Sequence, residues 1–242
     1  MIFDTLIKTG DAVLDLVSRR AKTNKNILIT YLNQNCFNVY KYNPGYAKIT
    51  ENVFHVYLDG AGIYIALVLL GCKNLKMINA TDLNEKILNL LISQRKKIFI
   101  VGGNFSEALI SEAVKKGINI CGYQNGYFDK EMEVHVIRKI EVANPEVIFI
   151  GMGVPKQEFF AVRLSSNVKG KLIICTGNFF EFYFQNIRRI PKRLRNIGVE
   201  WLFRLITEPK RLWKRYIFGI PLFSLYVFKE MFRRKKGRIV SN

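Results

Sequence analysis

Short runs of glycine and polar residues follow several apolar segments of this sequence, and these residue types suit a phosphorylated or nucleotide ligand. Backbone N–H groups of a glycine turn can approach phosphate oxygens closely, and the N-terminus of a following helix adds a partial positive charge. One such turn is a weak signal, because tight turns also use glycine for structural reasons. The runs occupy residues 33–35 (NQN), 59–62 (DGAG), 102–104 (GGN), 151–158 (GMGVPKQE) and 176–178 (TGN). Their recurrence after successive segments makes Asn33, Gly102 and Gly103 candidate ligand contacts.

Asp59 is the candidate for proton transfer. It ends an apolar run and precedes Gly-Ala-Gly, a position from which a carboxylate can reach a cleft floor and accept a proton from a hydroxyl group. The other interpretation is an aspartate that accepts backbone N–H bonds within its own turn, and the residues alone leave both open. Gln157 suits a hydrogen bond to a ligand, whereas Glu158 suits the electrostatics of a first helical turn.

The sequence lacks the common nucleotide and metal motifs. It contains neither G-x-G-x-x-G nor G-x-x-x-x-G-K-[ST], which disfavours ordinary dinucleotide binding and P-loop hydrolysis. It also lacks an Asp-x-Asp pair, and its four cysteines and two histidines are too dispersed for a structural zinc site. We therefore expect neither a metal nor another cofactor, so that a diphosphate must be neutralised by cations of the protein. Arg204 and Arg211 suit that role because guanidinium groups bind phosphate through two bonds; lipid headgroups are the alternative partners.

The positive charge of the chain is concentrated at its C-terminal end. The 242 residues contain 38 Lys and Arg against 19 Asp and Glu, a formal net charge of +19 that favours a polyanionic partner. Residues 188–242 hold sixteen of these cations and only three acids, interleaved with Trp, Phe and Leu at helical spacing. This composition is typical of a helix in the interface of an anionic membrane. Packing on the body or on a second subunit of a homo-oligomer, and binding to nucleic acid, are the alternatives.

The sequence predicts neither a signal peptide near its N-terminus nor a transmembrane helix near its C-terminus. The first twenty residues carry Asp4, Asp11 and Asp15 among apolar positions, which is not the pattern of a signal peptide. The longest apolar candidate, residues 216–228, contains Gly219 and Pro221 and is too short to cross a bilayer unaided. We therefore expect a cytoplasmic protein.

Alternating apolar and amphipathic segments must position the residues named above. Strands are predicted at residues 27–32, 53–58, 97–101, 118–121, 147–150 and 172–175. Helices are predicted at residues 35–42, 63–70, 82–94, 106–116, 130–142 and 156–166. Thr81 or Asp82, Ser106 and Asp129 are the expected N-caps of three of these helices.

This alternation predicts the fold class and the place of the site. Short strands separated by helices indicate an α/β protein, a single doubly wound domain with a mainly parallel sheet over residues 1–195. A basic amphipathic, helical C-terminal appendage is expected at residues 196–242. In open sheets of this kind ligands bind beyond the carboxyl ends of the strands, which is where the glycine and polar runs lie.

The order of the motifs resembles that of the WecG/TagA/CpsF family, glycosyltransferases of bacterial surface-polymer synthesis. The resemblance spans roughly residues 27–216, and its most specific strings are P-K-Q-E at 155–158 and E-W-L-x-R-L-x-x-E-P-x-R from Glu200. Shared motifs also include Asp59-Gly60-x-Gly62, Thr81-Asp82-Leu83, Gly102-Gly103, Gly126-Tyr127-Phe128, Gly151-x-Gly153, Gly177-x-Phe179 and Arg189-x-Pro191. The resemblance implies a Rossmann-like fold with a C-terminal appendage that associates with a membrane.

The resemblance also implies a reaction. It is the inverting, metal-independent transfer of an N-acetylhexosamine of the N-acetylmannosamine type from a UDP-sugar to a polyprenyl-diphosphate-linked sugar. This transfer would take place at the inner membrane face, in surface polysaccharide or teichoic acid synthesis, with Asp59 as the general base. Tyr127 would stack on uracil or pack as an ordinary aromatic, and Glu181 stands where the family carries an aspartate. Met77, Ala80 and Glu181 depart from the family pattern and leave the donor sugar open.

Two other function classes compete with this interpretation. A non-catalytic nucleic-acid-binding α/β protein would spread cations among exposed aromatics on the body, but here they concentrate beside Trp201, Trp213 and Phe218. A UDP-sugar epimerase would need a nicotinamide and a dinucleotide fingerprint, which the sequence lacks. The expected partners are therefore a UDP-N-acetylhexosamine donor, a polyprenyl-diphosphate-linked saccharide acceptor and an anionic membrane surface, with no nucleic acid.

Overall fold

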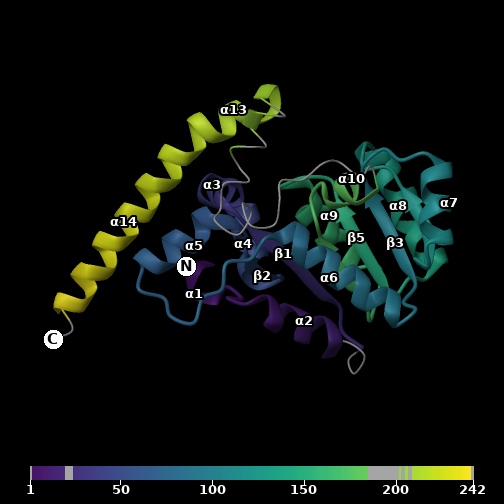
Figure 1. The fold of residues 1–242 in the computed structure, drawn as a ribbon, viewed down its shortest axis with the longest axis horizontal. Helices are drawn as coiled ribbons and strands as arrows, with labels where there is room; N and C mark the ends of the chain where they lie inside the picture. Colours follow the sequence, from purple (N-terminus) through teal and green to yellow (C-terminus); the bar gives the residue numbers. More distant parts are fainter. Residues whose placement is uncertain (1, 20–23, 185–201, 203–204, 207–208, 241–242) are drawn as a thin grey trace.

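The centre of the protein is a six-stranded sheet with the strand order β2-β1-β6-β5-β3-β4. The computed structural model describes residues 2–19, 24–184, 202, 205–206 and 209–240 (Figure 1). The strands are β1 (Ile27–Leu32), β2 (His55–Leu58), β3 (Ile98–Gly102), β4 (Ile120–Gln124), β5 (Val147–Gly151) and β6 (Leu172–Cys175). Every neighbouring pair is parallel, and each strand falls on one of the predicted apolar runs, which confirms the α/β class.

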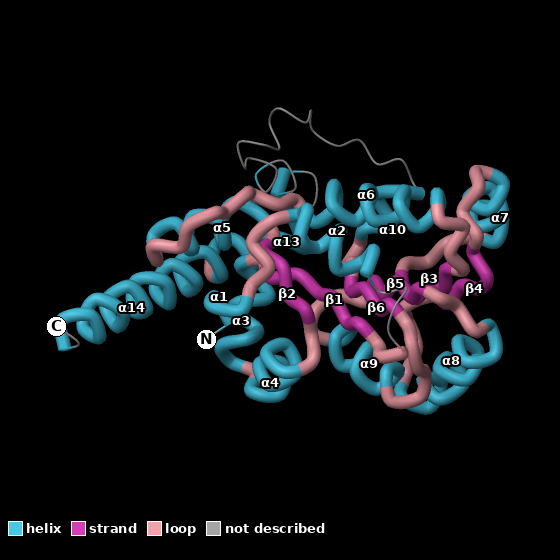
Figure 2. Tube along the Cα trace, turned by 90° about the horizontal axis from the view of Figure 1, so that it is seen from below, coloured by secondary structure: helices cyan, strands magenta, loops and turns pink. Residues whose placement is uncertain are grey.

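Helices cover both faces of this sheet. Figure 2 shows α3, α4, α8 and α9 on one face, and α2, α6, α7 and α10 on the other. The body helices are α1 (Ile2–Thr5), α2 (Gly10–Arg19), α3 (Gln34–Tyr42), α4 (Pro44–Asn52), α5 (Gly60–Leu69), α6 (Ala80–Ser93), α7 (Glu107–Lys115), α8 (Lys130–Ala143), α9 (Lys156–Ser165) and α10 (Phe179–Phe184). Since both faces are covered, β5 and β6 are almost continuously apolar and buried.

Two of the three expected helix caps are confirmed. Ser106 accepts a hydrogen bond from the backbone of α7, and Asp129 does the same for α8. The prediction for α6 is wrong, because the helix begins earlier, at Ala80. Asn79 is its N-cap, and its Oδ1 accepts bonds from the backbone N–H groups of Thr81 and Asp82 at 3.1 and 3.2 Å.

Three neighbouring strand ends carry glycine because their backbones approach one another closely. A Cβ at Gly102 would lie 2.5 Å from the carbonyl oxygen of Gly151, and one at Gly151 would overlap the carbonyl oxygen of Gly177. Gly177 has a φ of +58°, and a Cβ there would lie 2.6 Å from the Tyr31 hydroxyl. Side chains at these positions would therefore force β3, β5, β6 and β1 apart at the edge where the glycine runs were predicted to meet a ligand.

The C-terminal segment is helical where it is described, with α13 (Pro209–Ile217) and α14 (Gly219–Val240). One face of α14 packs on the body: the Phe223 ring lies edge-on to Phe37 with centroids 5.4 Å apart, and Val227 is buried. The Arg234 guanidinium bonds Asp4 at 2.7 Å. None of the described helices is both long and apolar enough to span a membrane. The predicted boundary between residues 195 and 196 lies outside the described residues.

Candidate active site

A cavity of about 350 Å³ lies beyond the carboxyl ends of β1, β5 and β6, at the edge predicted for the site. Its walls come from these strand ends, from the loops after β3 and β4, and from Leu212, Arg215 and Tyr216 of α13. Among the predicted residues, the cavity is lined by Asn33, Gly103, Tyr127 and Glu181. The sheet thus brings together side chains from positions more than a hundred residues apart.

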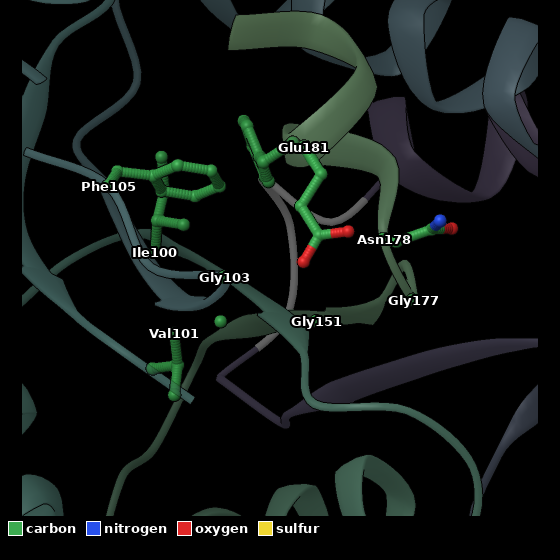
Figure 3. Close-up of a pocket in the computed structure, with 10 residues that line it drawn as sticks. Ile100, Val101, Gly103, Phe105, Gly151, Gly177, Asn178 and Glu181 are labelled. Carbon is green, nitrogen blue, oxygen red and sulfur yellow. The ribbon is translucent and has the colours of Figure 1, made fainter. Parts of the chain in front are cut away.

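Figure 3 shows the part of the site between β3 and β6. The Glu181 carboxylate extends from α10 toward Gly103 and Gly151, and the Asn178 side chain points away from it. The pocket drawn there is a small recess of about 10 Å³. It shares Glu181, Gly103 and Gly151 with the larger cavity. Gly102 lines only the recess, where its backbone is pressed against Gly151.

Asn33 connects the cavity to Asp59. It is the N-cap of α3, and its Oδ1 accepts a hydrogen bond from the backbone N–H of Cys36 at 3.1 Å. Its Nδ2 donates to Oδ2 of Asp59 at 3.3 Å. The same Oδ1 accepts from Nη2 of Arg215 at 3.2 Å. A single amide therefore contacts the candidate base on one side and a cation of the C-terminal segment on the other.

Asp59 stands at the end of β2 and is half-buried. Its side chain makes no capping bond to α5, the helix that it precedes. Its Oδ1 instead accepts from the backbone N–H of Ala80 at 2.9 Å, at the start of α6. Donors from two other segments, Asn33 and Ala80, therefore orient the carboxylate.

Gln157 and Glu158 lie behind the cavity wall, and both side chains are fully buried. Gln157 accepts a hydrogen bond from the Gly177 backbone N–H at 3.1 Å and donates to Glu158 Oε1 at 2.8 Å. Thr30 donates to the same oxygen at 2.8 Å. Burial raises the pKa of Glu158 to about 7, although these two hydrogen bonds favour the ionised form. Gln157 does not line the cavity, and its side chain instead holds the loop after β6.

Tyr127 is at the open edge of the cavity, with 77% of the residue exposed. The loop that carries it is held from two sides. The Gly126 N–H donates to the carbonyl of Gly103 at 3.2 Å, and Lys156 Nζ donates to the carbonyl of Phe128 at 3.1 Å. The ring is therefore available to a planar ligand on a supported loop.

The C-terminal arginines divide into three cases. Arg204 lies outside the described residues, and Arg211 belongs to α13 although the structure does not describe its side chain. Arg215, which composition assigned to the membrane surface, lines the cavity instead. Its Nε is buried and has no hydrogen-bond partner within the described structure. Its position four residues after Arg211, on the same helix face, was the signal that sequence reasoning missed.

The described residues contain no group of three or more His, Cys, Asp or Glu side chains that could hold a metal ion. The charged side chains that line the cavity are those of Arg215 and Glu181. A guanidinium with a buried, unpaired N–H suits an anionic ligand, because an oxyanion would satisfy that donor.

These features define a class: a Rossmann-like α/β fold with a cavity at the carboxyl edge of a parallel sheet and a cationic helix that forms part of its wall. The sequence profile described as the glycosyl transferase WecG/TagA/CpsF family matches residues 2–237. The chain belongs to this family and is a glycosyltransferase, as its motifs predicted.

Three curated relatives carry the same name, N-acetylglucosaminyldiphosphoundecaprenol N-acetyl-beta-D-mannosaminyltransferase. The relative from Bacillus spizizenii is 28% identical over 193 residues, covering 77% of this chain and 73% of the relative. The relative from Staphylococcus aureus is 25% identical over 220 residues, covering 90% and 85%. The relative from Bacillus subtilis is 30% identical over 184 residues, covering 73% and 69%.

Proposed function

We propose that this protein transfers an N-acetylmannosamine-type sugar from a UDP donor to a polyprenyl-diphosphate-linked N-acetylglucosamine, with inversion and without a metal. The names of the three relatives support the sugar and the acceptor. The observation that carries the proposal is that Asn33 and Arg215 both line the cavity and bond each other, and that Asn33 also bonds Asp59, which is not itself among the lining residues. This arrangement sets a carboxylate and a guanidinium on opposite sides of one amide, beside a cavity of about 350 Å³.

In the proposed mechanism Asp59 accepts the proton of an acceptor hydroxyl while the hydroxyl oxygen attacks the anomeric carbon of the donor. The bond between that carbon and the UDP oxygen breaks in the same step, and UDP leaves with the electron pair. A single displacement of this kind inverts the configuration at the anomeric carbon. The N–H groups of Asn33 and Ala80 hold the Asp59 carboxylate in place, so it needs no rearrangement before it accepts the proton.

Arg215 would stabilise the leaving diphosphate. Its Nη2 already bonds Asn33, and its buried Nε is the donor that an oxyanion in the cavity would satisfy. Arg204 and Arg211 are proposed to add to this charge. The exposed ring of Tyr127 is proposed to stack on uracil, and Glu181 to accept bonds from sugar hydroxyls near Gly103.

We further propose that the C-terminal helices hold the protein on the inner face of the cell membrane. Large apolar residues with 38% or more of their surface exposed support this: Trp213, Ile217, Phe218, Leu222, Leu225, Phe228 and Phe232. Docking on a second subunit or on nucleic acid is the competing role for the same surface. Because Phe223 and Val227 of α14 are part of the core, point variants test this role better than removal of the segment.

The direct test is transfer itself. Purified protein is incubated with a series of UDP-hexosamines and a lipid-diphosphate-N-acetylglucosamine acceptor, and the product is identified by mass and by the configuration of its new bond. We expect one UDP-N-acetylhexosamine to be transferred with inversion. Retention of configuration, or transfer from no UDP-sugar while a differently activated donor works, would overturn the proposal.

A further inference from the structure

Helix α5 is apolar on its outer face as well as on its inner face. Residues 60–72 contain no charged side chain. Ile63, Ala66 and Leu67 are buried against the core, while Ile65, Val68 and Leu69 are 55%, 50% and 51% exposed. A helix that covers a sheet in water normally turns polar residues outward. The outer face of α5 is therefore built to contact something other than water.

The exposed face of α5 lies at the same end of the molecule as α14. Figures 1 and 2 both draw the two helices beside each other, away from α8. They meet at Gly62, where a Cβ would lie 3.9 Å from the Phe223 ring. Opposite the face that packs on the body, α14 presents Leu222, Leu225 and Phe232 to solvent. Two helices that are distant in sequence thus offer apolar side chains at one end of the protein.

The charges around these helices indicate which partner they suit. The connection from Gly60 to Thr81 contains no acid, and it includes the exposed Lys73 and Lys76, the second of which pairs with Asp11 of α2 at 3.1 Å. In α14 the single acid is Glu230, which is 4% exposed and bonds both Arg233 and Arg234 at 2.8 and 2.9 Å. Exposed apolar residues bordered by cations, with the acid buried, complement an anionic lipid surface.

We propose that α5 is a second lipid-contacting element, which together with α14 forms one membrane-facing surface and fixes the height of the active site. Asp59 directly precedes α5. At about 1.5 Å per residue, Val68 lies about 13 Å further along the helix. A headgroup layer is roughly 5–8 Å thick. Because α5 would contact lipid through the side of the helix, its axis would lie along the membrane surface, and Asp59 would be held within about 13 Å of the lipid-contacting residues, near the headgroups of a lipid-linked acceptor.

This inference rests on the proposed function, because a lipid-contacting surface matters for an enzyme whose acceptor is lipid-linked. Vesicle binding nevertheless tests it in an assay that involves no sugar transfer. The full-length protein is compared with its Val68→Glu variant by co-sedimentation with vesicles of phosphatidylcholine and phosphatidylglycerol. Val134→Glu is the matched control, because Val134 is an exposed valine, 70% accessible, on α8 at the other end of the sheet. We expect Val68→Glu to weaken vesicle binding about tenfold and Val134→Glu to leave it unchanged.

A gain-of-signal variant guards against a folding defect. In a background in which the native Trp201 and Trp213 are replaced by phenylalanine, Val68→Trp fluorescence should be quenched by vesicles whose acyl chains are brominated, and Val134→Trp fluorescence should not. Unquenched Val68→Trp, or equal losses in both glutamate variants, would overturn the proposal. If Val68→Glu instead dissociates a dimer in sedimentation while vesicle binding stays intact, the surface belongs to a second copy and the proposal is wrong. If the vesicle-binding and quenching results are as expected but the protein transfers no sugar, the proposed function is wrong and this inference stands.

Discussion

Glu158 gives the protein a pH-dependent stability whose sign and size follow from its burial. The side chain is fully buried, Oε2 has no hydrogen-bond partner in the described structure, and burial raises its pKa from 4.5 to about 7. Below pH 4.5 the carboxyl is protonated in both the folded and the unfolded chain, and folding carries no ionisation penalty. Between pH 4.5 and 7 the unfolded chain ionises while the folded chain keeps its proton, so the free energy of unfolding falls. The loss is on the order of 3 kcal/mol and is complete above pH 7.

Glu158→Gln removes this titration and keeps an oxygen that can accept from Thr30 and Gln157. Urea unfolding of the wild type and the variant from pH 4.5 to 8 should show the difference in stability moving in favour of the variant across this window. Glu112→Gln is the control, because the hydrogen bond from Lys116 lowers the pKa of Glu112 and its titration falls below the window. Parallel stability curves for wild type and Glu158→Gln would refute the reasoning.

The remaining predictions concern catalysis. Asp59→Asn should leave folding and UDP binding intact and lower turnover by about 10²–10⁴-fold, and near-normal turnover would remove Asp59 from the mechanism. Arg215→Gln should weaken UDP binding about tenfold in calorimetry. Arg233→Gln should leave UDP binding unchanged, because Arg233 pairs with Glu230 and does not line the cavity. Equal effects of the two variants would mean that Arg215 contributes only general positive charge. Transfer should survive EDTA, and loss on chelation with rescue by Mg²⁺ or Mn²⁺ would contradict a metal-independent reaction.

The alternation of the sequence was sufficient to predict the sheet and its carboxyl edge. The apolar runs that became β3, β5 and β6 are continuous because these parallel strands are buried on both faces, whereas the edge strand β4 is only half-buried. The glycine and polar runs that follow them could be assigned to one edge by topology alone. Asn33, Gly103, Tyr127 and Glu181 do converge there on one cavity.

Local pattern could not predict which residues face the cavity and which support it. Gln157 and Gly102 belong to the same runs as the lining residues, but Gln157 turns inward to the Gly177 backbone and Gly102 is required by the approach of Gly151. Both outcomes depend on the spacing between neighbouring strands, which one segment of sequence does not contain. Arg215 was missed for a related reason, since the composition of its helix is the same whether its cations face lipid or a cavity.

The docking of the C-terminal helices on the body argues for a fixed rather than a swinging arrangement at the membrane. Asn38 Nδ2 donates to the carbonyl of Gly219 at 2.9 Å, and Phe223 and Val227 are buried against the body. Undocking α14 would expose these two side chains, at about 1.5–3 kcal/mol each. If α13 moved with it, Arg215 would also separate from Asn33. A membrane that binds the outer face of α14 need not move it. The cost of undocking therefore favours a fixed surface that positions the cavity at the membrane. The contact between Arg215 and Asn33 is then present before the protein binds lipid.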